Sequence, residues 1–300
     1  MEVIVMKGAE TAGAISRSVT DVTESLKARK ESGEDIRLPK LVIIRVGERP
    51  DDLSYERGAK KRMENVGIEC QVCAFPADIS HEEFEREFLK INGDPEVDGI
   101  LMLRPLPKTI NEKKITMLMD PQKDVDCISP VNLGKIFMGE KDGYAPCTAQ
   151  AVMEMIETSG IDLTGKNVTV IGRSLVVGKP LAQMLMSKNA TVTQCHTKTV
   201  NTPRIASEAD IIVACAGSMK MVDAAYVSEK TLAVFDVGIN VDENGKLCGD
   251  VDLEGIREAL AESDTPAVIV TPVPGGVGAV TNSVLAKHVL ESYLKKQPQG

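Results

Sequence analysis

KNVTVIGRSLVVGKP, the stretch Lys166–Pro180, combines an apolar β-branched run, a glycine-rich turn and the start of a helix. Gly172 and Gly178 bracket the turn, and Pro180 suits the first helical turn, where its missing N–H is harmless. A strand that leads into a helix through glycines forms an anion site, because free N–H groups at the helix start point toward the ligand. The stretch therefore predicts a nucleotide site, with an ordinary tight turn as the alternative.

Basic residues around this turn favour one class of cofactor. Arg173 and Ser174 replace the middle of a plain G-x-G-x-x-G pattern, and Arg173 adds a fixed positive charge beside a phosphate. A dinucleotide site commonly has a carboxylate about 20 residues after the glycines, but residues 193–198, TQCHTK, contain none. Lys198 and His196 would instead face a 2′-phosphate, which favours NADP over NAD; for His196 an ordinary loop role is the alternative.

Length and charge limit the function classes. The 300 residues suit one or two domains. The formal charge of 35 − 44 = −9 argues against a nucleic-acid groove as the main function. No apolar run of about 18 residues predicts a membrane span, and the N-terminal MEVIVMKGAE has no signal-peptide core. We therefore expect a cytoplasmic protein without nucleic-acid or membrane partners.

The cysteines and histidines do not predict a metal site. Seven scattered cysteines, an odd number, indicate free thiols in a reducing compartment. Cys70 and Cys73 form a CxxC in a predicted strand, where residues three apart point to opposite faces. His81 in HEEFE does not form the HExxH motif of zinc proteases.

Predicted elements alternate between strand and helix in two segments of the chain, which indicates parallel strands joined by crossover helices. The predicted strands are 1–8, 38–47, 68–76, 97–107, 167–172, 190–196, 231–240 and 266–276, with another within 205–217. The predicted helices are 9–31, 54–66, 81–94, 110–120, 148–160, 180–189 and 282–296, and 121–136 is expected to be a loop.

The last predicted helix is apolar on one face and is expected to pack on the first segment. This gives one domain of residues 1–149 plus 282–300 and a second of residues 150–281.

Several stretches, read together with the glycine-rich turn, resemble the methylenetetrahydrofolate dehydrogenase/cyclohydrolase family (the FolD type). They occur in family order from about residue 40 onward, and GRSxxVGKP together with TPVPGGVG is specific to this family. The matching stretches are VDGILMLRPLP (97–107), KDVDCISPVNLGK (123–135), YAPCT (144–148), ATVTQCH (190–196), ADIIVACAG (209–217), DVGIN (236–240), GDVD (249–252) and TPVPGGVGAVTNSVL (271–285).

The resemblance implies an α/β fold of two domains with a cleft between them. One is an N-terminal folate-binding domain, and the other is a Rossmann-like, doubly wound domain that binds NADP or NAD. The dehydrogenase step moves a hydride from 5,10-methylenetetrahydrofolate to the nicotinamide, and the cyclohydrolase step hydrates the methenyl cation to 10-formyltetrahydrofolate. The resemblance also implies a homodimer.

Two residues carry over from the family as catalytic and folate-binding. Tyr55 matches the tyrosine that stacks on the folate, and a planar ring suits that role. Asp126 matches the aspartate that holds the pterin, whose adjacent N–H and amino donors a carboxylate accepts together. A loop turn is the alternative role for Asp124, and to a lesser degree for Asp126.

The remaining carried-over residues bind the cofactor or line the reacting rings. Small residues in the last three positions would let backbone approach the rings. The resemblance implies that Gly172, Arg173, Ser174 and Thr197 bind the cofactor, that Ile239 meets its nicotinamide end, and that Pro274, Gly275 and Gly276 bind the folate.

The sequence departs from the family at two interacting positions. The family motif Tyr-x-x-x-Lys places both side chains on one helix face, but the lysine position is Ala59, with Lys60 next to it. The glutamine expected to orient that lysine is Leu103, followed by Arg104. Paired loss is physically coherent, because a buried partner left alone would be unsatisfied.

These departures predict a dehydrogenase with weak or absent cyclohydrolase activity. A bifunctional enzyme in which Lys60 or Arg104 replaces the lysine is one alternative. A non-catalytic folate- or nucleotide-binding protein is another, which the retained Tyr55 and Asp126 disfavour. A Rossmann dehydrogenase for a different substrate is disfavoured by the KDVD and PVPGGVG motifs.

Overall fold

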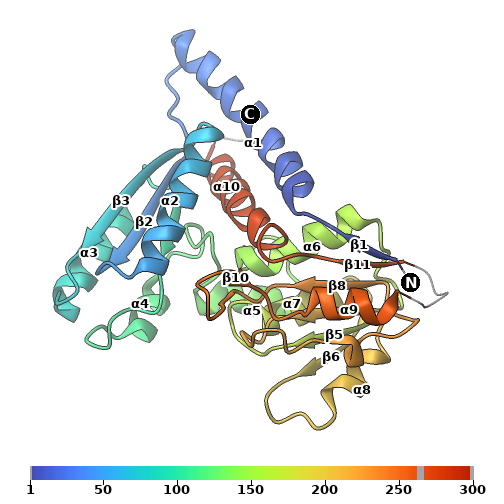
Figure 1. The fold of residues 1–300 in the computed structure, drawn as a ribbon. Coiled ribbons are helices and arrows are strands. Elements are labelled where there is room, and N and C mark those ends of the chain that lie inside the picture. The colour runs from blue at the N-terminus through green and yellow to red at the C-terminus, as the bar shows by residue number, and fades with distance from the viewer. Residues whose placement is uncertain (1, 262–266, 298–300) are drawn as a thin grey trace. The chain divides into compact units, whose positions relative to one another are not determined.

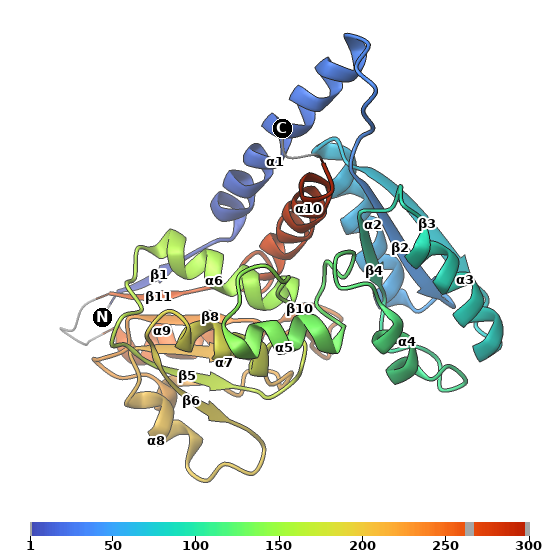
Figure 2. The ribbon, with the colours of Figure 1, turned by 180° about the vertical axis from the view of Figure 1, so that it is seen from behind.

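The computed structural model describes residues 2–261 and 267–297, and the chain forms two α/β units (Figures 1 and 2). One unit contains residues 13–147 together with the chain from Asn282 onward. The other contains the described residues of 1–12 and of 148–281. The chain therefore passes between units within α1 (Ala9–Glu31) and α10 (Gly278–Lys295), and at the start of α6 (Cys147–Ser159).

The first unit is built on a three-stranded parallel sheet with the order β3-β2-β4. These strands are β2 (Lys40–Val46), β3 (Glu69–Phe75) and β4 (Gly99–Met102). Crossover helices follow β2 and β3, as the alternation of elements predicts, and they are α2 (Pro50–Asn65) and α3 (His81–Gly93).

The two faces of this sheet have different cores. Alternate side chains of β2 and β4 pack with Phe84 and Phe88 of α3 and Ile115 of α4 (Glu112–Leu118). The other alternate residues, which include Ile43 and Leu101, are buried on the opposite face. Helix α2 covers that opposite face, because Arg45 of β2 forms an ion pair there with Glu56 of α2.

The C-terminal part of α10 packs against the same unit. The hydroxyl of Ser292 donates to the backbone oxygens of Asp98 and Gln122 at 2.7 and 2.8 Å. The phenol of Tyr293 donates to the backbone oxygen of Arg37 at 2.7 Å. These bonds attach the last helix to residues just before β2 and β4 and near Asp124 of the same unit.

The second unit is built on a six-stranded parallel sheet in the order β1-β11-β8-β7-β5-β6. Because β6 and β7 lie on opposite sides of β5, the strand order reverses at β5, as in doubly wound folds. The strands are β1 (Val3–Val5), β5 (Asn167–Ile171), β6 (Thr191–Cys195), β7 (Ile211–Ala214), β8 (Ala233–Asp236) and β11 (Val268–Val270). The remaining elements of this unit are α7 (Gly178–Met186), α8 (Thr202–Ser207), η1 (Ala224–Tyr226), α9 (Leu253–Leu260) and the antiparallel pair β9 (Asn240–Val241) and β10 (Leu247–Cys248).

Three sequence-based expectations differ from the structure. Residues 2–12 were expected in the first domain, but β1 pairs with β11 and joins the larger sheet. Helix α2 begins at Pro50 rather than at residue 54, with Asp51 and Asp52 in its first turn. Part of the expected loop 121–136 forms helix α5 (Pro130–Met138).

Helix α5 has ordinary start and stop signals. The hydroxyl of Ser129 accepts a hydrogen bond from Asn132 N, and Pro130 occupies the first turn. Gly139 follows the last turn with φ of 73°, a conformation that favours glycine. The acidic and proline-rich residues before it obscured this pattern in the sequence.

Candidate functional site

The predicted nucleotide site is a backbone cradle between β5 and α7. Gly172 has φ of +146°, and a Cβ there would collide with the backbone oxygen of Cys215. A Cβ at Gly178 would collide with the backbone of Gly172. The turn is closed by Ser174, whose side-chain oxygen accepts from Val177 N at 3.1 Å. The strand, the glycines and the helix start therefore form the geometry that a nucleotide phosphate requires.

Two expected cofactor residues lie exposed beside this turn, and a third follows the neighbouring strand. Arg173 and Ser174 are exposed, as is Thr197, which follows β6. The Nδ1 atom of His196 accepts a hydrogen bond from Lys198 N at 3.1 Å. Nδ1 of His196 is therefore used within the loop, which agrees with the alternative of an ordinary loop histidine. The Lys198 side chain remains exposed.

Two buried aspartates shape the loops at the ends of β7 and β8. The carboxylate of Asp250 accepts from the backbone N–H groups of 216–218 at 2.7–2.9 Å and from Asn240 Nδ2 at 2.9 Å. The carboxylate of Asp236 accepts three backbone N–H bonds of 3.0 Å, and burial raises its pKa to about 6. Ile239 is exposed within this network. Both stretches, DVGIN (236–240) and GDVD (249–252), were recognised in the sequence, but the role of their aspartates was missed.

The predicted folate-side loop after β11 consists of Pro274, Gly275 and Gly276. Pro274 and Gly275 are exposed, whereas Gly276 is buried. Gly275 has φ of +96°, and its backbone oxygen accepts from Gly8 N at 2.9 Å. A Cβ at Gly276 would collide with the backbone oxygen of Pro272. The loop therefore needs glycine for its own packing, and the approach of its backbone to the reacting rings stays a prediction.

Tyr55 and Asp126 come together in the first unit. Tyr55 lies on α2 and is half-buried. Burial raises the pKa of its phenol, and the nearby carboxylate of Asp126 raises it further. The carboxylate of Asp126 accepts a hydrogen bond from Cys147 N at 3.0 Å. Burial raises the pKa of Asp126, while this bond and the charge of Arg104 oppose the shift. The pair thus combines a neutral aromatic ring with a half-buried acceptor.

Asp124 has the loop role that was considered for both aspartates. Its fully buried carboxylate accepts from the N–H groups of Ile128 and Ser129, both at 2.8 Å, and from Asn132 Nδ2 at 3.0 Å. These bonds fix the turn that leads into α5. The carboxylate of Asp126, two residues on, is half-buried and keeps capacity to accept further bonds.

The positions of the family lysine and glutamine are both buried and apolar. Ala59 is fully buried and Leu103 is 7% exposed. Lys60 is exposed, and its charge acts on Cys70 of β3. Burial raises the pKa of the Cys70 thiol to about 11, and the positive charge of Lys60 opposes that rise. Arg104 forms an ion pair of 3.5 Å with Glu112.

A buried ion pair lies on the face of the three-stranded sheet that α2 covers. Arg45 on β2 donates from Nε to Glu56 Oε2 at 2.6 Å and from Nη1 to the backbone oxygen of Gly47. Both side chains are at least four-fifths buried. Sequence reasoning missed this pair, although an arginine in the apolar run KLVIIRV was a visible signal.

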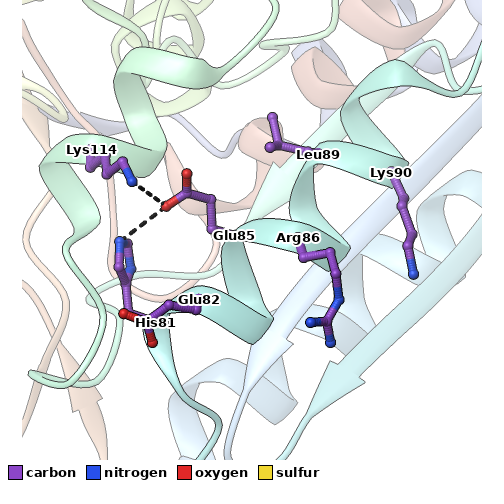
Figure 3. A pocket seen from close by; sticks show the side chains of 7 residues that line it. All are labelled: His81, Glu82, Glu85, Arg86, Leu89, Lys90 and Lys114. Atoms are coloured by element: carbon purple, nitrogen blue, oxygen red, sulfur yellow. Dashed lines mark ion pairs between the residues drawn. The ribbon is translucent and has the colours of Figure 1, made fainter.

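A surface pocket of about 550 Å³ lies elsewhere on the first unit, over α3 (Figure 3). In it, Glu85 Oε2 lies 3.1 Å from His81 Nε2 and 2.6 Å from Lys114 Nζ, as ion pairs. Leu89, Arg86 and the other lining residues are mixed in charge and polarity. None of the residues predicted for the site lines this pocket.

Within residues 2–261 and 267–297, no group of three or more histidine, cysteine, aspartate or glutamate side chains is arranged to hold a metal ion. In the same described residues, no helix combines the length and apolarity needed to cross a membrane.

Comparisons with known proteins give one family. The tetrahydrofolate dehydrogenase/cyclohydrolase catalytic domain matches residues 6–126, and the NAD(P)-binding domain of the same family matches residues 146–297. The chain is 48% identical to the bifunctional protein FolD of Clostridium kluyveri over 293 residues, 98% of each chain.

Solved structures agree with this match. The bifunctional FolD enzyme of Campylobacter jejuni has a TM-score of 0.90 at 32% identity, covering 98% of this chain and 100% of that one. The Trypanosoma brucei FolD, complexed with NADP cofactor and inhibitor, has a TM-score of 0.87 at 34% identity, with 98% of both chains covered. The chain therefore belongs to the tetrahydrofolate dehydrogenase/cyclohydrolase family.

Proposed function

We propose that this chain is an NADP-dependent dehydrogenase that oxidises 5,10-methylenetetrahydrofolate to 5,10-methenyltetrahydrofolate, with weak cyclohydrolase activity. The observation that carries the proposal is one contrast within the first unit. The Tyr55–Asp126 pair is retained, whereas Ala59 and Leu103 are buried and apolar where the family has a lysine and a glutamine.

Tyr55 and Asp126 would bind the folate. The half-buried carboxylate of Asp126 would accept the adjacent N–H and amino donors of the pterin. The ring of Tyr55 would stack on the folate, and its raised pKa keeps the phenol protonated at neutral pH. Pro274, Gly275 and Gly276 would add backbone contacts to the folate.

The cradle at Gly172 and Gly178 would hold the cofactor pyrophosphate on the N–H groups at the start of α7. Ser174 and Thr197 would contact the ribose and phosphates, and exposed Arg173 suits a 2′-phosphate. When bound, the nicotinamide accepts the hydride, and Ile239 would lie at that end. The NADP in the Trypanosoma brucei relative supports this choice; NAD is the alternative.

The hydration step needs a placed water and a group that manages its proton. A lysine at position 59 would supply such a group, and Ala59 does not. Full bifunctionality is a second candidate, because the charge of Arg104 reaches Asp126 and opposes the rise in its pKa. Replacing Arg104 by methionine, which keeps a long side chain without charge, separates the two candidates.

A two-part spectrophotometric assay tests the proposal. The purified protein receives 5,10-methylenetetrahydrofolate with NADP and then with NAD, and reduced cofactor and methenyl product are followed together. In a second assay, methenyltetrahydrofolate decay is compared with decay in buffer. We expect cofactor reduction with accumulation of the methenyl product. Absence of cofactor reduction with either nucleotide would favour a non-catalytic binding protein and contradict the proposal.

Asp126→Asn tests the folate role directly. It replaces one carboxylate oxygen with an NH2 donor and removes the negative charge. We therefore expect kcat/KM to fall roughly 100-fold, the effect of losing one or two charged hydrogen bonds. The NADP affinity should stay unchanged, since Asp126 has no role in the cradle. A similar loss in kcat/KM and in NADP affinity would indicate general misfolding.

We further infer a homodimer in the cytoplasm. The family membership supports the dimer, and seven free cysteines support a reducing compartment. Light scattering after gel filtration measures the mass, and fractionation of cells locates the protein. A stable monomer, or protein outside the cytoplasmic fraction, would contradict the respective inference.

A further inference from the structure

A buried histidine holds the peptide group that precedes Asp126. His288 of α10 is 5% exposed, and its Nδ1 lies 2.9 Å from the backbone oxygen of Val125. A carbonyl oxygen only accepts hydrogen bonds, so Nδ1 carries a proton and donates it. The imidazole therefore fixes the carbonyl group of the peptide that joins Val125 to Asp126.

Cys147 holds the same peptide group and also the carboxylate of Asp126. Its thiol donates to the Val125 oxygen at 3.3 Å, and its backbone N–H donates to Asp126 Oδ1 at 3.0 Å. The Cys147 Sγ atom lies 3.9 Å from His288 Nδ1. The two side chains thus meet at one buried carbonyl oxygen, whose two lone pairs can accept both bonds.

Both donors are uncharged at neutral pH. Burial lowers the pKa of the His288 imidazole and raises the pKa of the Cys147 thiol. The imidazole is therefore neutral, and the thiol keeps the proton that it donates. The ring of Tyr144 packs against that of His288, with their centroids 5.3 Å apart. A neutral ring with a packed face and one fixed N–H group is suited to orient a neighbour.

Contacts next to His288 fix its place on α10. A Cβ built on Gly99 would lie 2.9 Å from the side chain of Val289 and 3.0 Å from that of Val125, so the missing side chain of Gly99 lets the helix approach this loop. Ser292, one turn after His288 on the same helix face, donates to two backbone oxygens of the same unit. The helix therefore brings a rigidly held donor to the Val125 oxygen.

The chain after Asp126 is held separately. The carboxylate of Asp124 accepts from the N–H groups of Ile128 and Ser129, both at 2.8 Å. Cys127 has φ of 56°, a turn conformation that this anchor holds in place. Asp126 thus lies between two anchors, and the donors to the Val125 oxygen form the one on its N-terminal side.

We propose that His288 is a positioning residue that holds Asp126 in the orientation needed to bind the pterin. The inference rests on the proposed function, because it assigns His288 a task in the folate site. A carboxylate accepts two adjacent donors only when its plane faces both of them. A rotation of the peptide before Asp126 would turn that plane away.

Removing the imidazole would cause such a movement. The fully buried Val125 oxygen would keep only the weak thiol donor, and an undersatisfied buried carbonyl tends to shift toward a new partner. The bond from Cys147 N to the Asp126 carboxylate would then change as well. We therefore expect the substitution to act on folate binding rather than on hydride transfer.

Three substitutions of His288 separate the donor from the packing of the ring. His288→Leu removes the donor and keeps an apolar side chain. His288→Asn places an amide nitrogen where Nδ1 lies, whereas His288→Gln places it one bond farther out, near Nε2. Ser292→Ala is the matched control, because it removes buried hydrogen bonds of the same helix without touching Val125.

Four quantities are measured for each variant: KM and kcat with 5,10-methylenetetrahydrofolate, the Kd for NADP and the free energy of unfolding in urea. We expect His288→Leu and His288→Gln to raise KM about tenfold, with kcat changed less than about twofold and an unchanged Kd for NADP. His288→Asn should keep KM close to that of the wild type. Ser292→Ala should lower stability and leave KM unchanged.

A wild-type KM in folded His288→Leu would overturn the inference, as would an increase in Ser292→Ala as large as that in His288→Leu. If His288→Leu does not fold, the two amide variants decide the matter, and an equal KM in His288→Asn and His288→Gln would overturn it. Absence of cofactor reduction by the wild type would instead contradict the proposed function.

Discussion

The guanidinium of Arg45 lies 2.6 Å from the carboxylate of Glu56, in an ion pair between the central strand β2 and helix α2. It is the charged feature of a sheet face whose other members, such as Ile43 and Leu101, are apolar and fully buried. Glu56 directly follows Tyr55, so the pair fixes the helix that carries the proposed folate-binding ring.

Replacing one member of this pair should reduce the free energy of unfolding more than replacing both members. Glu56→Leu leaves a buried, unpaired guanidinium, and we expect the free energy of unfolding to fall by about 3 kcal/mol. The double variant Arg45→Leu/Glu56→Leu should recover most of that loss, because no uncompensated charge remains. Urea unfolding measures both. Glu254→Gln, in an exposed pair with Arg257, should change stability by less than about 1 kcal/mol. Equal losses in single and double variants would contradict the expectation.

Restoring the family pair should restore hydration. We expect Ala59→Lys/Leu103→Gln to raise the methenyl decay rate at least about 100-fold, the lower end of the usual contribution of a positioned acid–base group. Ala59→Lys alone should destabilise the fold, since a fully buried lysine would lack its partner.

The assay follows methenyl absorbance, with circular dichroism to check folding. Leu103→Gln alone is the control for the added amide. A folded double variant whose methenyl decays no faster than that of the wild type would show that Ala59 and Leu103 do not limit hydration.

The pH dependence of stability should reflect Asp236. Burial raises its folded pKa to about 6 from an ordinary 3.8, so between these pH values the folded state binds more protons than the unfolded state. Its contribution to stability is therefore largest below about pH 4 and is lost as the pH rises through 6, by roughly 3 kcal/mol at most.

Unfolding by urea at pH 4.5 and 7 measures this difference. Asp236→Asn, which does not titrate, should show a weaker decline in stability between these pH values than the wild type does. An identical decline in the two proteins would assign the pH dependence to other groups.

Gly172→Ala should weaken cofactor binding strongly. The residue has φ of +146°, and the added Cβ would collide with the backbone of Cys215, so the turn must move. We expect the Kd for NADP, measured by calorimetry, to rise about 100-fold or more, which corresponds to about 2.7 kcal/mol. Gly134→Ala, at an open position of helix α5, should bind NADP normally. Normal binding by Gly172→Ala would contradict the cradle.

The sequence was most informative where local signals and long-range structure agree. The predicted helix 9–31 has the same bounds as α1, and the predicted strands that follow it lie where β2 and β3 do. Hydrophobic period and glycine punctuation act over a few residues, so they define such elements directly.

Features that depend on distant partners were missed for a physical reason. The apolar run of β1 signals a strand, but only its pairing with β11 assigns it to the larger sheet. The role of Arg45 depends on Glu56 of α2, which it meets on one face of the sheet. No local pattern encodes such contacts, whereas the assignment of Tyr55 and Asp126 to the folate rests on motif matches and stays a prediction.

The return of α10 to the first unit has a consequence for synthesis of the chain. The ribosome makes the protein from the N-terminus, so residues 13–147 emerge long before Ser292 and Tyr293 are available to bond with Asp98 and Arg37. The unit that carries Tyr55 and Asp126 therefore completes its core only after α10 has been synthesised. A chain terminated before α10 would lack the bonds of Ser292 and Tyr293 to this unit.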